Sequence, residues 1–177
     1  MTEPHDIAAR IRLSSGDITR LRVDAIVNAA NTSLLGGGGV DGAIHRAAGP
    51  ELLAECRRLG GCPPGEARLT GGHRLPAAHV IHTVGPIWRG GIDGEHEILE
   101  NCYHSCLGIA CRQKFRDIAF PAIATGIYGF PREAAAGIAV ATVAAHLRQQ
   151  QFPELVNFIC FDAPTLEAYR NALGADI

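Results

Sequence analysis

No segment of the 177-residue sequence approaches the ~20 consecutive apolar residues that a membrane-spanning helix needs. Residues 1–10 are charged and have no apolar centre, so they are not typical of a secretory signal peptide or a lipidation site. We therefore expect a cytoplasmic protein with no membrane partner.

A basic cluster is also missing. Lys and Arg total 16, Asp and Glu total 18, and the formal net charge is −2 at pH 7. The basic residues are scattered, and no basic groove with interleaved aromatic residues is indicated. Nucleic acid is therefore not expected as a partner.

The six cysteines form no C-x-x-C pair, and a chain of this length can bury a core without covalent cross-links. We interpret them as reduced thiols. With 47% hydrophobic and 19% charged residues, and with no repeat, low-complexity tract or linker, the composition indicates a single domain spanning residues 1–177.

Patterns of metal ligands are weak. His79 and His82 lie three apart in a predicted strand, where such positions face opposite sides of a sheet. Cys102 and Cys106, with His104 between them, fit the apolar stripe of a predicted helix. We therefore expect no metal site and no zinc.

Short apolar runs alternate with stretches of helical periodicity. The runs at residues 25–30, 80–84, 118–122 and 155–161 are predicted to be buried strands. Residues 95–113 and 132–150 are predicted to be helices. This alternation favours an α/β sheet covered by helices on both faces.

Two glycine-rich segments, residues 28–45 and 121–131, each follow an apolar run. Ligands of open α/β sheets bind at this end of the strands, and glycine lets backbone N–H groups approach a phosphate closely. A helix start near Asp41 would add a partial positive charge. Two such loops could hold a diphosphate from two sides, whereas the alternative is that the glycines only form flexible connections.

The spacing of Gly37, Gly39 and Gly42 matches the G-x-G-x-x-G pattern of nicotinamide dinucleotide folds. That interpretation fails because the strand ends several residues before the glycines. In addition, Cys-Pro-Pro-Gly at residues 62–65 stands where a ribose-binding acid is needed. Neither glycine segment contains the Gly-Lys-Ser/Thr sequence of a P-loop.

Several polar residues in these segments can be either structural or functional. Asp41 would be repelled by bound phosphate unless it had a task, but Asp is also a favoured helix N-cap, contributing ~1 kcal/mol. His45 falls on the same helix face and could orient the carboxylate or be an ordinary surface residue. Asn28 and Asn31 suit either sugar hydroxyls or Asx turns, and Tyr128 either walls off a sugar or packs.

The glycine segments resemble the signature segments of macrodomains of the MacroD type, and they occur in the same order. The matching segments are residues 27–31 (VNAAN), 36–49 (GGGGVDGAIHRAAG) and 124–129 (ATGIYG). The likeness extends through residues 16–19, 83–86 and 160–162, and so covers nearly the whole chain. Within the family, the sequence is similar to the bacterial stand-alone O-acetyl-ADP-ribose deacetylases.

The resemblance implies a three-layer α/β/α fold with a central mixed β-sheet and an ADP-ribose cleft at its crest. Asp17 would accept a hydrogen bond from the adenine amino group, with Ile18 beside it, and Phe161 would lie against the adenine ring. Ala124 stands where many relatives have serine, which removes one possible hydrogen bond to phosphate. The backbone groups that would wrap the diphosphate belong to Gly37, Gly38, Gly39, Val40, Thr125, Gly126, Ile127 and Gly129.

The resemblance also implies an activity. Asp41 would be the catalytic carboxylate, with Asn31 and Tyr128 fixing the distal ribose and Asn28 close by. The substrates would be O-acetyl-ADP-ribose and mono-ADP-ribose esters on Glu or Asp side chains, so ADP-ribose esters and mono-ADP-ribosylated proteins would be the partners. Asp41 and the substrate's own diphosphate would activate water without a cofactor. The alternatives are a non-catalytic ADP-ribose reader and a phosphatase acting on ADP-ribose phosphate.

Overall fold

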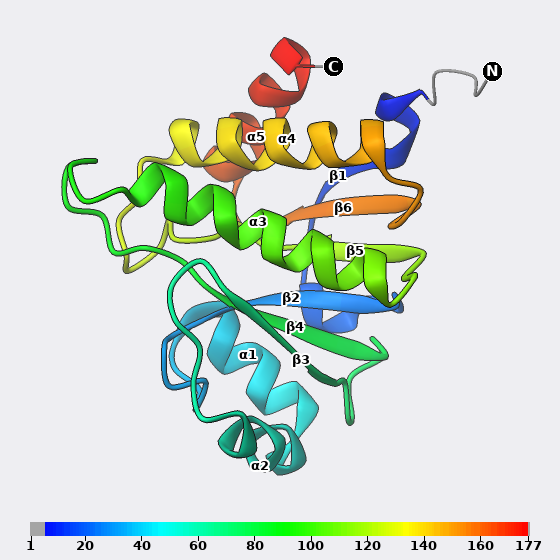
Figure 1. The fold of residues 1–177 in the computed structure, drawn as a ribbon, viewed down its shortest axis with the longest axis vertical. Coiled ribbons are helices and arrows are strands. Elements are labelled where there is room, and N and C mark those ends of the chain that lie inside the picture. Colours follow the sequence, from blue (N-terminus) through cyan, green and yellow to red (C-terminus); the bar gives the residue numbers. More distant parts are fainter. Residues whose placement is uncertain (1–5, 177) are drawn as a thin grey trace.

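A computed structural model describes residues 6–176. It has three layers, with helices on both faces of a six-stranded sheet whose strand order is β1-β6-β5-β2-β4-β3 (Figure 1). The prediction about residues 1–10 lies partly outside this range. Within it, none of the helices combines the length and the apolar character needed to cross a membrane.

The strands are short and the helices cover them from both sides. The strands are β1 (Ile11–Ser15), β2 (Ala25–Ala30), β3 (Ala67–Gly71), β4 (His79–Val84), β5 (Asp117–Phe120) and β6 (Leu155–Cys160). The α-helices are α1 (Gly39–Ala48), α2 (Pro50–Leu59), α3 (Glu95–Arg112), α4 (Arg132–Gln149) and α5 (Ala163–Asp176). Two 3-10 helices, η1 (Ile7–Arg10) and η2 (Ile18–Arg20), flank β1.

The sheet is mixed, because β3 is antiparallel to β4 while the other neighbouring pairs are parallel. The carboxyl ends of β1, β6, β5, β2 and β4 therefore meet at one edge. Alternate residues of each strand enter two hydrophobic cores. Val27 and Ile81 join the core under α3, α4 and α5, whereas Ile26 and Val80 join the core under α1 and α2.

The predicted α/β architecture is confirmed, with small differences at element ends. Strand β5 ends at Phe120 rather than at residue 122, because Pro121 has no N–H to donate to a neighbouring strand. Strand β6 ends at Cys160, and Phe161 beyond it is 94% exposed. Each of the two predicted helices ends one residue earlier than predicted, at Arg112 and Gln149.

Two strands, β1 and β3, and two α-helices, α2 and α5, were not predicted from the sequence, and neither were the two 3-10 helices. Strands β1 and β3 are the two edges of the sheet, and most of their residues are half-buried or exposed, so that neither forms an apolar run. The start of helix α2 could have been predicted from the sequence, since Pro50 at its first position and Glu51 in its first turn are both typical of helix starts.

Candidate active site

The two glycine-rich segments lie at the same edge of the sheet. One connects β2 to α1 and the other connects β5 to α4. Because β2 and β5 are parallel neighbours, both loops leave the carboxyl ends of adjacent strands. This is the position at which open α/β sheets bind ligands.

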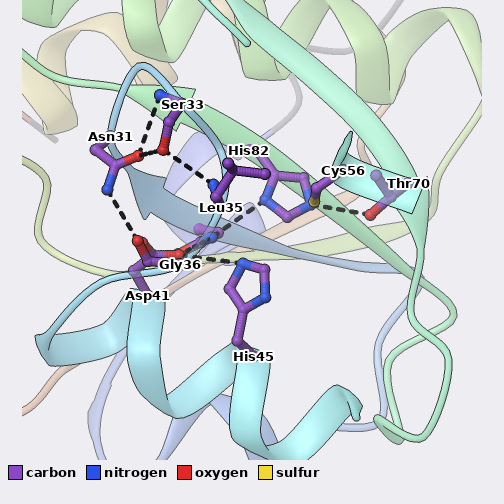
Figure 2. A network of polar contacts seen from close by, with 10 residues as sticks. Asn31, Ser33, Leu35, Gly36, Asp41, His45, Cys56, Thr70 and His82 are labelled. Atoms are coloured by element: carbon purple, nitrogen blue, oxygen red, sulfur yellow. Dashed lines mark hydrogen bonds and ion pairs between the residues drawn. The ribbon is translucent and has the colours of Figure 1, made fainter. Parts of the chain in front are cut away.

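Asn31 shapes the first loop. Its Nδ2 donates to the carbonyl of Gly36 at 2.9 Å, and its Oδ1 accepts from the backbone N–H and the hydroxyl of Ser33 at 3.2 and 2.6 Å (Figure 2). This is the Asx-turn arrangement that the sequence left open. The predicted contact of Asn31 with a ribose stays a prediction.

Helix α1 begins within the glycine run. Its N-cap is Gly38, which has no side chain to cap the helix, and Asp41 lies in the first turn instead. The N-cap alternative for Asp41 is therefore wrong. Its carboxylate is only 4% exposed and accepts a 2.8 Å hydrogen bond from Nδ2 of Asn28.

The loop backbone passes very close to this carboxylate. A Cβ added to Gly37 would lie 3.0 Å from Asp41 Oδ2, and one added to Gly42 would lie 2.5 Å from the carbonyl oxygen of Gly37. Glycine is needed at position 42 because a side chain there would push the loop away from α1, and a side chain at position 37 would crowd the Asp41 carboxylate. Gly37, Gly38 and Gly39 are exposed and Val40 is half-buried.

Burial raises the pKa of Asp41, while the hydrogen bond from Asn28 and the nearby His45 act in the opposite direction. His45 Nε2 lies 3.5 Å from Asp41 Oδ1, so the structure supports the alternative in which His45 contacts the carboxylate (Figure 2). A raised pKa makes this carboxylate a stronger base than a solvated aspartate.

Unused hydrogen-bonding capacity gathers around Asp41. Within the described residues, two buried side-chain polar atoms have no hydrogen-bond partner, Oδ1 of Asn28 and Nε2 of His45. Both belong to side chains that contact Asp41. Because unpaired buried polar atoms are costly, their presence here is typical of a site that receives a ligand or a water molecule.

Three further side chains, which sequence reasoning did not assign to this site, complete the group. His82 Nδ1 lies 3.1 Å from Nδ2 of Asn28, and its Nε2 lies 2.9 Å from Thr70 Oγ1 and 3.8 Å from Cys56 Sγ (Figure 2). Burial, and secondarily the charge of His45, lower the pKa of His82 to about 3. The sequence presented His82 only as a candidate metal ligand.

The second loop is held by its own backbone. Phe130 N–H donates to the carbonyl of Ala124, whose φ is 67°, and Gly129 N–H donates to Gly126. Trp88, which follows β4, donates its N–H to the carbonyl of Tyr128 at 2.8 Å. These bonds present Gly126 and Ile127 to solvent, whereas Thr125 and Tyr128 are half-buried.

The residues expected to contact adenine meet at the neighbouring strands β1 and β6. Gly16 N–H donates to the carbonyl of Cys160, which places Asp17 and Phe161 on adjacent connections. Hydrogen bonds from the Thr19 hydroxyl and N–H lower the pKa of Asp17, which keeps its carboxylate an acceptor. Ile18 is buried beside it.

The order of the strands places the parts of the candidate site side by side along one edge of the sheet. The predicted adenine contacts lie over β1 and β6, the two glycine loops over β5 and β2, and Asn28 pairs with His82 between β2 and β4. The structure thus brings the predicted site residues to one edge of the sheet. Their individual contacts with a ligand stay predictions.

Metal ligands and cysteine nucleophiles are not assembled here. Residues 6–176 contain no group of three or more His, Cys, Asp or Glu side chains that could hold a metal ion. His79 contacts the ring of Phe115 in one core and His82 contacts Cys56 in the other, as expected for strand positions three apart. All six cysteines are free, and burial raises the pKa of Cys56 to about 11, which disfavours the thiolate.

Comparisons with known proteins agree on one family. The family model described as "Macro domain" matches residues 27–139. A macro domain-containing protein of Mesorhizobium japonicum is 58% identical over 166 residues, covering 94% of this chain and 94% of its own.

Two further relatives have more informative names. A Citrobacter rodentium protein named O-acetyl-ADP-ribose deacetylase is 54% identical over 169 residues, covering 93% of this chain and 96% of its own. The crystal structure of a Trypanosoma brucei macrodomain in complex with ADP-ribose is 44% identical, with a TM-score of 0.90, over 97% of this chain and 73% of that one.

Proposed function

This chain belongs to the macrodomain family, and we propose that it is an ADP-ribose-binding hydrolase. Its substrates are O-acetyl-ADP-ribose and mono-ADP-ribose esters on Glu or Asp side chains of proteins. The name of the Citrobacter rodentium relative and the ADP-ribose complex of the Trypanosoma brucei macrodomain support this proposal. We further propose that residues 1–177 form one macrodomain, since both hydrophobic cores share a single sheet.

The ligand lies across the carboxyl ends of the strands, from β1 and β6 at one end to β2 at the other. Adenine contacts Asp17, Ile18 and Phe161 at the β1 and β6 end, and the exposed glycines of the two loops surround the diphosphate. The distal ribose then lies beside Asn28, Asn31 and Asp41, with Tyr128 covering it. Neutral backbone N–H groups and the start of α1 supply the attraction for phosphate.

The observation that carries the proposal of catalysis is the buried carboxylate of Asp41, which faces the glycine loop and has a raised pKa. A reader of ADP-ribose gains nothing from a negative charge on the phosphate side of its cleft. Asp41 and the substrate diphosphate position a water molecule against the ester carbonyl or the adjacent anomeric carbon, and Asp41 accepts the proton of that water. On the carbonyl route, the ribose oxygen departs with a proton, leaving ADP-ribose and the free acid. On the anomeric route, which applies only to an ester at that carbon, the water oxygen bonds to the anomeric carbon, the C–O bond to the ester breaks, and the acid leaves with a proton.

The test is a single-turnover assay of the purified chain with O-acetyl-ADP-ribose, following acetate release with and without EDTA. We expect release in both conditions. Asp41→Asn is expected to release acetate at least about a hundredfold more slowly, as when a general base is removed, with ADP-ribose affinity maintained. Asp93→Asn is the control, because it removes an exposed carboxylate from another loop.

Other results would change the assignment. Unchanged turnover in Asp41→Asn would contradict the role of Asp41. Tight ADP-ribose binding by the wild-type chain with no acetate release would make the protein a reader. Loss of release in EDTA would contradict the metal-independent mechanism.

A further inference from the structure

We propose that His82 is a positioning residue for this hydrolysis: through a single tautomer it fixes the direction of the Asn28 amide, and through Asn28 it holds Asp41. The inference deepens the proposed function and rests on it for its kinetic test. It also predicts which nitrogen of the His82 ring carries the proton in the ligand-free protein, and this can be measured without any enzyme assay.

The sheet brings these residues together. Asn28 and His82 are register partners on the parallel strands β2 and β4, and Thr70 lies on β3, the next strand. Asn28 and His82 have no exposed surface, and Thr70 is 2% exposed. Water therefore does not compete for their hydrogen bonds, and each proton must be placed among the side chains themselves.

The proton positions follow from one constraint. The ionised carboxylate of Asp41 only accepts hydrogen bonds, so the Asn28 atom 2.8 Å from it is Nδ2, which donates. The second hydrogen of Nδ2 is directed to His82 Nδ1 at 3.1 Å, and Nδ1 must therefore carry no proton. His82 is then neutral, with its proton on Nε2.

The Nε2 side of the His82 ring continues this series of hydrogen bonds. Nε2–H donates to Thr70 Oγ1 at 2.9 Å, and the Thr70 hydroxyl donates to the carbonyl of Gly71 at 3.1 Å. The hydrogen bonds therefore run in one direction, from Asn28 through the ring of His82 to Thr70 and then to the carbonyl of Gly71. The lowered pKa of His82, about 3, agrees with a ring that stays neutral at working pH.

Fixing the amide has a consequence for the reaction. A reversed amide would place Oδ1 of Asn28 against both the Asp41 carboxylate and the lone pair of His82, which is unfavourable in a buried site. In the observed direction, Oδ1 of Asn28 is left without a partner beside Asp41. In this direction Asn28 keeps donating to Asp41, and its buried oxygen is an unused acceptor next to the carboxylate.

The first test is kinetic and uses Thr70→Val, which keeps the shape of Thr70 and removes the oxygen acceptor for Nε2–H, leaving only the longer contact with Cys56 Sγ at 3.8 Å. We expect kcat for O-acetyl-ADP-ribose to fall roughly ten- to a hundredfold, the range seen when a partner that orients a functional group is lost. The Kd of ADP-ribose should change much less, and Thr70→Ser should restore kcat because it keeps the hydroxyl.

A matched control separates positioning from packing. Thr83 is also fully buried, and its hydroxyl donates to the carbonyl of Glu66 at 2.8 Å, on the face of β4 opposite His82. Thr83→Val should lower the melting temperature as much as Thr70→Val does, yet leave kcat unchanged. Equal losses of kcat in the two variants would overturn the proposal.

The second test is NMR of the His82 ring nitrogens in the wild-type protein at pH 7 and pH 5. We expect one neutral tautomer, with the proton on Nε2, at both values. A proton on Nδ1, or a mixture of tautomers, overturns the proposal even if Thr70→Val fails to fold. If the tautomer is as expected and the wild-type chain hydrolyses no ester, the proposed function fails and the proton arrangement stands.

Discussion

At the scale of single residues, the buried carboxylate of Asp41 lowers stability at neutral pH. Its pKa is raised above the ordinary value of 3.8, so the folded state disfavours the ionised form. The stability associated with the protonated form is present below the unfolded pKa and is lost as pH rises through the folded pKa. Ionised Asp41 thus lowers stability, and the proposed mechanism requires this ionised form.

We predict that Asp41→Asn melts at a higher temperature than the wild type at pH 7. A gain of about 1 kcal/mol would correspond to roughly 2–4 °C in a domain of this size. The gain should shrink as pH falls through the raised pKa of Asp41 and should be lost below the ordinary value of 3.8, because the wild-type carboxyl is then neutral too. Calorimetry of both proteins at pH 7 and pH 3.5 checks this. A variant that melts lower at pH 7 would contradict the electrostatic argument.

The same raised pKa predicts the pH dependence of turnover. The proposed mechanism needs the ionised carboxylate, so the single-turnover rate should fall as pH drops through the pKa of Asp41. The midpoint should lie above the ordinary aspartate value of 3.8. Rates with O-acetyl-ADP-ribose between pH 3.5 and 8 measure it, with Asp41→Asn as the background. A rate that stays flat down to pH 3.5 would argue against Asp41 as the base.

Phe161 tests the predicted adenine end of the cleft. Its ring is 94% exposed, so removing it costs the fold little, while losing a stacked base weakens binding. Phe161→Ala should weaken ADP-ribose binding about tenfold, corresponding to ~1.4 kcal/mol, with an unchanged melting temperature. Calorimetric titration measures the affinity. Ile92→Ala, 84% exposed on another loop, should bind as the wild type does, and equal losses would refute the assignment.

At the scale of elements, the packing of α1 against the first loop can be tested with a single methyl group. A Cβ at Gly42 would lie 2.5 Å from the Gly37 carbonyl, whereas one at Gly137 in α4 would meet nothing within 4 Å. Gly42→Ala should cost about 1–3 kcal/mol and displace the loop, weakening ADP-ribose binding. Gly137→Ala should stabilise the protein by about 1 kcal/mol and leave binding intact. Urea unfolding and titration of both variants compare them.

The strands also show which parts of the fold and of the site could be predicted from the sequence. Strands β2 and β4 are buried on nearly all of their length, so they form mainly apolar runs that identify them directly, although Asn28 interrupts the first and His82 the second. The edge strands β1 and β3 are partly solvated and present no such run. Asp41 and Asn28 lie close in sequence within recognisable segments, but His82 and Thr70 join them only through the register of β2, β4 and β3. That register is a tertiary property that no local pattern contains.

At the scale of the whole molecule, phosphate recognition is expected to be nearly independent of salt. The chain has a net charge of −2, and neither residues 31–41 nor residues 121–131 contain Lys or Arg. In the proposed binding mode neutral N–H groups hold the diphosphate, and short-range hydrogen bonds are screened little. The Kd of ADP-ribose should change less than about threefold between ~0.05 and ~0.5 M salt. A steep weakening would point to a cationic side chain in the site.

The chain contains one tryptophan, Trp88. It is half-buried, its backbone N–H donates to the carbonyl of Tyr128, and the centroid of its indole ring lies 4.7 Å from that of the Phe130 ring. The intrinsic fluorescence of the protein therefore comes chiefly from an indole attached to the second glycine loop. Its emission will report any rearrangement of that loop as ADP-ribose enters, so stopped-flow mixing can time loop movement separately from ester cleavage without an added label.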